Sequence, residues 1–139
     1  MCDLSITKIF EILDMVKQEK YTLVEQDNDS ATYCKKIHKS EAMINFNEPA
    51  DEIYNKFKAY YEWPGICFEH KNIFIKIKEM GVIDDSEVNF YDKNIVINKN
   101  GLFIKTGNNT IVITYLQMPN KNVISSSDAF NAYKDYFNE

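Results

Sequence analysis

Arginine is absent from this chain of 139 residues, and all 16 basic side chains are lysine. Arginine supplies the planar fork that binds phosphate or guanine through two parallel hydrogen bonds, whereas lysine acts as a point charge. Any contact with nucleic acid through these side chains is therefore expected to favour phosphate and to carry little base specificity. The formal net charge of −5 also argues against a general binder of polyanions.

Cysteine and histidine are also scarce. Cys2, Cys34 and Cys67 are an odd number at wide spacings, which suits neither a disulfide framework nor a zinc site. His38 and His70 lie in no CxxC or HExxH context. The sequence therefore predicts no metal site.

Long apolar runs and catalytic motifs are missing as well. No apolar run approaches the ~20 residues needed to cross a bilayer, and the first residues lack the basic and apolar blocks of a secretory signal. We therefore expect a cytoplasmic protein with no membrane partner. There is no glycine-rich phosphate loop, no GxSxG motif and no paired carboxylate between apolar residues, so no catalytic residue is assigned.

The charge is distributed unevenly. Residues 1–30 contain seven acidic side chains and three lysines, whereas residues 31–105 contain eleven of each sign. The central region can therefore present a basic face although the whole chain is acidic.

Helical and extended segments are predicted from hydrophobic spacing. Helices are expected over residues 5–20, 50–61 and 128–137, and residues 26–30 are typical of a linker. Strands are expected over residues 66–70, 73–78, 94–98, 102–105 and 110–116, with an earlier candidate at 42–46 and a polar loop at 117–126. Asn47 is the expected N-cap of the middle helix, and Ser126 or Ser127 that of the last. Short consecutive antiparallel strands favour a small closed or partly open barrel.

Lysines on the predicted strands suggest a binding face. Lys76 and Lys78 alternate with Ile75 and Ile77, which places both ammonium groups on one face and both isoleucines in the core. An ordinary solvated sheet face is the alternative interpretation. No aromatic side chain is recognisable as an exposed base-stacking residue, because most Tyr and Phe occupy positions that suit a core.

Three stretches resemble methionyl-tRNA formyltransferases. The first begins at Gln26, continues through Ala31-Thr32-Tyr33 and the lysines after it, and ends with Glu41-Ala42-Met43-Ile44-Asn45-Phe46. The second contains Lys58-Ala59 and Trp63-Pro64-Gly65. The third contains Gly101-Leu102, Thr106-Gly107, Leu116-Gln117, Lys121, Ser125 and Asp128-Ala129-Phe130. Together they cover about residues 26–137 in the family's order.

The resemblance implies a domain organisation. Residues 1–25 would match the last helix of the family's Rossmann-type catalytic domain, which is otherwise missing here. Residues 26–40 would be the linker, and residues 41–139 a C-terminal domain with a partly open, oligonucleotide-binding-like (OB-like) barrel. The fold expected is thus mainly β with flanking helices.

The resemblance also implies a function. The family transfers a formyl group from 10-formyltetrahydrofolate to the methionine amine of initiator methionyl-tRNA. Its catalytic and folate motifs belong to the other domain, so this chain alone should have neither catalytic residues nor a cofactor. The C-terminal domain offers a basic surface to tRNA, and position in the motifs assigns Lys35, Lys36, Lys39 and Lys121 to it, with Lys76 and Lys78 as extensions.

Two other interpretations remain open. Formyltransferases acting on amino-sugar nucleotides share the catalytic fold, and the chain could be the C-terminal domain of such an enzyme. A free-standing OB-like barrel acting as a binding module is the third.

Overall fold

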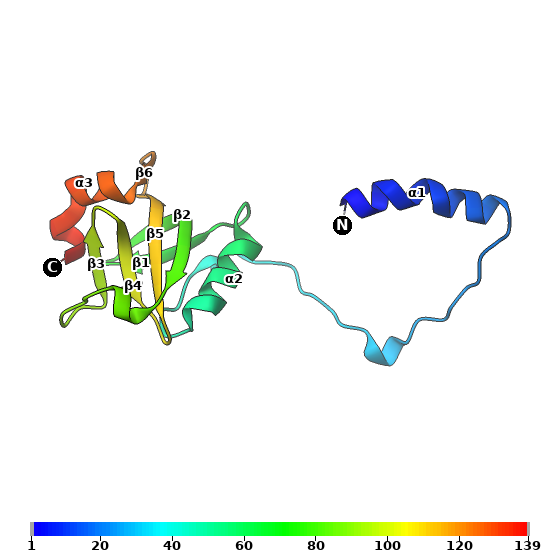
Figure 1. The fold of residues 1–139 in the computed structure, drawn as a ribbon, viewed down its shortest axis with the longest axis horizontal. Coiled ribbons are helices and arrows are strands. Elements are labelled where there is room, and N and C mark those ends of the chain that lie inside the picture. The colour runs from blue at the N-terminus through cyan, green and yellow to red at the C-terminus, as the bar shows by residue number, and fades with distance from the viewer. Residues whose placement is uncertain (1, 139) are drawn as a thin grey trace. The chain divides into compact units, whose positions relative to one another are not determined.

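The computed structural model describes residues 2–138, which fall into two compact units, one before residue 36 and one from residue 36 onward (Figure 1). The first unit contains α1 (Cys2–Lys17) and the short 3-10 turn η1 (Asn28–Ser30). The predicted first helix is therefore present, although it begins and ends about three residues earlier than expected.

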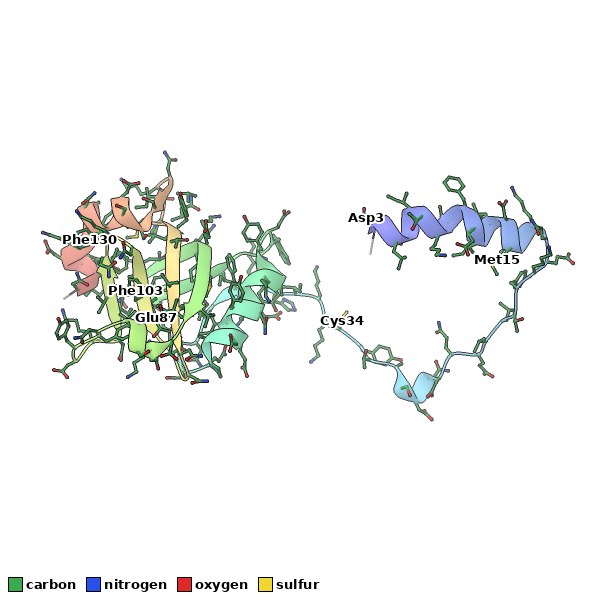
Figure 2. All side chains as sticks on the ribbon, in the orientation of Figure 1. Asp3, Met15, Cys34, Glu87, Phe103 and Phe130 are labelled. Atoms are coloured by element: carbon green, nitrogen blue, oxygen red, sulfur yellow. The ribbon has the colours of Figure 1, made fainter. Side chains whose placement is uncertain are left out.

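α1 has no packed face within its own unit. Every side chain from residue 3 to residue 35 is exposed, and Figure 2 shows Asp3 and Met15 on the helix and Cys34 on the extended segment after it. The exposed apolar side chains of the helix are Leu4, Ile6, Ile9, Phe10, Ile12, Leu13, Met15 and Val16. A 16-residue helix without tertiary packing is marginally stable in water.

The second unit is built on one antiparallel sheet of six strands. They are β1 (Ile66–His70), β2 (Ile73–Ile83), β3 (Ile95–Asn98), β4 (Gly101–Lys105), β5 (Thr110–Gln117) and β6 (Val123–Ser125). The order is β1-β2-β5-β4-β3, with β6 paired to β5. β1 and β3 are thus the outermost strands of an open sheet, and the predicted mainly-β fold with flanking helices is confirmed.

Two helices complete the core on the inner face of the sheet. α2 (Ala50–Tyr60) contributes the buried Ile53 and Phe57, and α3 (Ser126–Asn138) contributes Ala129 and Phe137. The buried strand residues of the same cluster are Ile66, Phe68, Ile75, Ile77, Met80, Ile97, Leu102, Ile104, Ile111, Ile113 and Leu116. Because both helices pack on this face, they leave the opposite face of the sheet uncovered.

The end of α3 connects the two edge strands. The Tyr136 hydroxyl donates to the His70 carbonyl at the end of β1 over 2.6 Å, and the His70 ring stacks on Phe137 with 5.5 Å between ring centres. The Asn138 side chain accepts from the Ile97 amide of β3 over 2.9 Å and donates to the Ile97 carbonyl over 3.2 Å. α3 therefore bridges the open side of the barrel.

The strand predicted at residues 42–46 is wrong. Residues Lys39–Ala42 form a 3-10 turn, η2, and Met43 makes only an isolated parallel bridge to Cys67 of β1. The Asn45 side chain then accepts a hydrogen bond from the Asn47 amide over 3.1 Å, which turns the chain before a strand can continue.

The N-cap predicted for α2 is also wrong. Pro49, not Asn47, is the N-cap residue, and it provides no side-chain hydrogen bond. The Ala50 amide instead donates to the Asn108 carbonyl in the β4–β5 turn over 3.0 Å. A tertiary contact thus replaces the local cap.

The segment predicted as a polar loop at 117–126 contains more structure than expected. β6 pairs with β5 there, and α3 begins at Ser126. Ser125 supplies the cap, since its hydroxyl oxygen accepts from the Asp128 amide over 3.1 Å. The cap is therefore one residue earlier than Ser126 and two earlier than Ser127, the two serines predicted.

Candidate nucleic-acid interface

One row of residues crosses the outer face of the sheet. Met43 bridges Cys67, Cys67 lies opposite Lys76, Lys76 lies opposite Gln117, and Gln117 lies opposite Val123. Because neighbouring strands lie about 4.8 Å apart, the row spans roughly 19 Å. This row begins at Met43, in the segment that precedes α2, and ends at Val123, next to the loop between β5 and β6.

The side chains of β2 alternate as predicted. Ile75 and Ile77 are buried in the core, whereas Lys76 and Lys78 are exposed on the opposite face. We call this surface the outer sheet face, and it comprises Phe74, Lys76, Lys78, Tyr115, Gln117, Lys121 and Val123. It combines cationic, amide and apolar groups, and the carboxylate of Glu69 lies beside it on β1, opposite Phe74.

Two irregularities bend the β2–β5 pair beside this face. Glu79 lies opposite Tyr115, so Lys78 is an extra residue on β2 and Thr114 an extra residue on β5. Such bulges increase the local twist and re-aim side chains. Here Lys78 and Glu79 both become exposed, and Lys78 lines an open pocket of about 370 Å³ together with Tyr61 and Val123.

The loop between β5 and β6 is held to the sheet by its own polar groups. The Gln117 side-chain amide donates to the Lys121 carbonyl over 2.8 Å, and the Lys121 amide donates to the Met118 carbonyl over 3.1 Å. Asn120 adopts a positive φ of 58°, which asparagine tolerates well. Met118 is buried, so Lys121 is presented by an anchored turn.

A half-open pocket of about 440 Å³ lies between this loop and the β1–β2 turn. Phe74 and Lys76 of β2 line one side, Gln117 of β5 the next, and Asn72 and Asn120 of the two turns the rim. The pocket thus joins an exposed ring, an ammonium group and several amides in one place.

The lysines of this face are available to bind an external anion. In the part of the chain that the structure describes, residues 2–138, neither Lys76, Lys78 nor Lys121 forms an ion pair. Burial raises the pKa of the Cys67 thiol, and the Lys76 ammonium opposes that effect only in part. The thiol therefore stays protonated at neutral pH and provides no thiolate as a partner for the Lys76 side chain.

The segment that carries Lys36 and Lys39 is anchored to the same unit. Glu41 accepts from the His38 amide over 2.7 Å and from the Tyr60 hydroxyl of α2 over 3.0 Å. These two hydrogen bonds, with the backbone bond first, lower the pKa of the Glu41 carboxyl. Lys39 lies within η2, so this contact fixes its backbone relative to α2.

The six predicted binding lysines are thus divided. Lys76, Lys78 and Lys121 come together on or beside the outer sheet face. Lys36 and Lys39 lie in the segment that leads to it, while Lys35 belongs to the first unit. All six are exposed.

Sequence reasoning missed the aromatic residues of this face. Phe74 and Tyr115 are 53% and 44% exposed. The exposure of Phe74 could have been predicted, because side chains alternate between the two faces of a strand. Phe74 is two residues from Lys76 and therefore lies on the lysine face, opposite the buried isoleucines. Tyr115 could not have been placed this way, since the bulge at Thr114 interrupts the alternation.

Two kinds of feature are absent from residues 2–138. No group of three or more His, Cys, Asp or Glu side chains there could hold a metal ion. No described helix is long and apolar enough to cross a membrane.

Comparison with known proteins gives the class of this domain. The family described as "Formyl transferase, C-terminal domain" matches residues 36–134, which include the whole sheet and most of α3. The chain belongs to this family.

Its relatives include curated methionyl-tRNA formyltransferases. The protein of that name from Finegoldia magna is 37% identical over 107 residues, which cover 77% of this chain and 34% of the relative. That from Blochmanniella pennsylvanica is 31% identical over 134 residues, which cover 91% of this chain and 42% of the relative. The resemblance found in the sequence motifs is thereby confirmed, and the chain spans well under half of these relatives' length.

Solved structures agree on the fold. A crystal structure of HypX from Aquifex aeolicus in complex with tetrahydrofolic acid has a TM-score of 0.62 at 11% identity, covering 90% of this chain and 22% of that one. A HypX variant gives a TM-score of 0.65 at 10% identity, covering 93% and 23%. At such identities the likeness concerns the fold alone.

Proposed function

We propose that this chain is the tRNA-binding C-terminal domain of a methionyl-tRNA formyltransferase that acts in the cytoplasm. The complete enzyme would transfer a formyl group from 10-formyltetrahydrofolate to the methionine amine of initiator tRNA. The observation that carries the proposal is the grouping of Lys76, Lys78 and Lys121 on one exposed face without ion pairs among residues 2–138. Family membership and the named relatives support it.

The lysines would act through phosphate. Lys76 and Lys121 flank Gln117, so two ammonium groups could follow one strand of RNA across the sheet, with Lys78 one step further along β2. Lys35, Lys36 and Lys39 would extend the same contact from the linker. Because lysine lacks the fork needed for base readout, binding should depend strongly on salt and weakly on sequence.

The catalytic groups would lie outside this chain. Residues 1–25 would be the last helix of the catalytic domain, which would give the exposed apolar stripe of α1 a partner surface. The folate would also bind to that catalytic domain. No step of the reaction is therefore assigned to the residues of this chain.

A salt titration tests the proposal. Initiator and elongator tRNAs are titrated with the wild type and with the Lys76→Ala, Lys78→Ala, Lys121→Ala triple variant at several salt concentrations. Each lost duplex phosphate contact should reduce the salt slope by about 0.9, so the triple variant should lose roughly two to three units of slope. The control is the Lys93→Ala, Lys99→Ala, Lys134→Ala variant, which removes equal charge from other places.

Two results of this titration would contradict the proposal. Equal affinity and slope in the two triple variants would show that the outer sheet face is not the tRNA site. No binding by the wild type even at low salt would overturn the proposal. The net charge of −5 would then favour the domain of an amino-sugar nucleotide formyltransferase, whose substrate requires no basic barrel.

A further inference from the structure

We infer that the pocket beside Phe74 holds one unpaired nucleotide of the bound RNA, with its base against the Phe74 ring and its phosphate against Lys76 and Lys121. This inference rests on the proposed function, because it assigns a site to part of the same ligand.

Phe74 is an exposed apolar residue on the solvent side of β2, where alternation with the buried isoleucines predicts a polar side chain. It shares its face with Lys76 and Lys78, and its cross-strand neighbour on β1 is Glu69 rather than an apolar residue. Within the described residues it takes part in no ring–ring contact, unlike Phe46, Phe57 and Phe68. Its ring is therefore free to stack against a planar ligand, and stacking of a base on an aromatic side chain tolerates any base.

The pocket rim offers hydrogen-bonding groups at the edge of such a base. Asn72 and Asn120 line it, and both have positive φ, 62° and 58°, in tight turns on opposite sides. Their side-chain amides can donate and accept, as the edges of bases require. A volume of about 440 Å³ is within the range of sites for single small ligands.

Charge fixes the direction of the nucleotide. Glu69 lies opposite Phe74 on β1, whereas Lys76 lies two residues further along β2, opposite Gln117 of β5, and Lys121 lies in the loop after β5. A phosphate is repelled from Glu69 and attracted to the two lysines, so the backbone of the RNA runs along the β5 side of the pocket.

The occupant must be unpaired. A base inside a duplex is stacked on both faces and cannot present one to a side chain, so a single nucleotide in a loop, a bulge or an end is the form that fits. The phosphate contacts of the lysines make no such demand. The two contributions are therefore separable by experiment.

The test uses a short single-stranded RNA containing 2-aminopurine, a blunt RNA duplex and initiator tRNA. Phe74→Leu removes the ring but keeps apolar bulk, and Phe74→Trp keeps a ring. Tyr91→Leu, at another exposed aromatic position, is the control. Phe74→Leu should weaken single-strand binding on the order of tenfold and abolish 2-aminopurine quenching, with an unchanged salt slope and unchanged duplex affinity. Phe74→Trp and Tyr91→Leu should behave as the wild type.

Other outcomes separate this inference from the proposed function. If the lysine variant loses tRNA binding but Phe74→Leu changes nothing, the nucleotide site is wrong and the function stands. If the single strand binds through Phe74 but tRNA does not bind, the function is wrong and the site stands. Self-association of the wild type that Phe74→Leu abolishes would assign the ring to a protein contact and overturn the inference.

Discussion

The Gln117 side-chain amide donates a 2.8 Å hydrogen bond to the backbone carbonyl of Lys121, which ties the loop after β5 to the strand that faces Lys76. Two of the proposed phosphate ligands are thereby held on either side of one glutamine. Lysine side chains are flexible, so a fixed backbone for each reduces the conformational entropy lost on binding.

Loss of this hydrogen bond should loosen the loop. In Gln117→Leu we expect a loss of about 1 kcal/mol in the free energy of unfolding and faster amide exchange in residues 118–122. Hydrogen exchange and urea unfolding measure both effects. Gln26→Leu, in the exposed segment between α1 and η1, is the control. Unchanged exchange in residues 118–122 would mean that the loop is held by the buried Met118 alone.

Gly107 is predicted to be sensitive to a single methyl group. A Cβ added there would overlap the Asn47 carbonyl oxygen, whereas a Cβ at Gly81 would lie at an ordinary 3.5 Å from Val112. We expect Gly107→Ala to cost about 3 kcal/mol and Gly81→Ala less than about 1 kcal/mol. Urea unfolding of the two variants checks this, and equal midpoints would contradict it.

The bridge formed by α3 should respond to removal of one hydroxyl. Tyr136→Phe removes the hydrogen bond to His70 but leaves the edge-on contact of the two rings at 5.0 Å. We expect a loss of about 1 kcal/mol, with faster exchange at the ends of β1 and α3. Tyr91→Phe, at a largely exposed ring, should change neither.

The anchoring of η2 should depend on acid pH. Hydrogen bonds from the His38 amide and the Tyr60 hydroxyl lower the pKa of Glu41 in the folded state. The contribution of the Glu41 carboxylate to folding stability is therefore fully present above the usual glutamate pKa of about 4.3. It is lost as the pH falls through the lower pKa that Glu41 has in the folded state. NMR titration of the Glu41 carboxyl and the Tyr60 ring follows the change. Glu41→Gln should abolish this transition, and an ordinary pKa for Glu41 would contradict the contact.

The two units should be thermodynamically separate. Every buried residue of the described chain lies after residue 41, and none lies in the first unit. Deletion of residues 1–35 should therefore leave the thermal unfolding midpoint of the remainder unchanged, and residues 5–20 should exchange rapidly in the dilute monomer. Protection of residues 5–20 equal to that of the strands would contradict this.

Much of the architecture could be predicted from local pattern. The helices, five of the six strands and the opposite faces of Ile75 and Lys76 follow from hydrophobic spacing that each segment carries within itself. The motifs around Lys39, Trp63 and Gln117 were enough to suggest the family, since their residue types and order survive without knowledge of contacts.

The rest depended on partners distant in the sequence. The beginning of α2 is set by the Asn108 carbonyl, the end of the linker by the bridge between Met43 and Cys67, and the exposure of Tyr115 by the bulge at Thr114. No local pattern encodes such contacts, because each exists only when two separate segments meet. The sequence alone therefore determined most of the elements and the family they belong to. The tertiary structure decided which lysines share a face with an exposed ring, since only strand register brings Lys76 opposite Gln117.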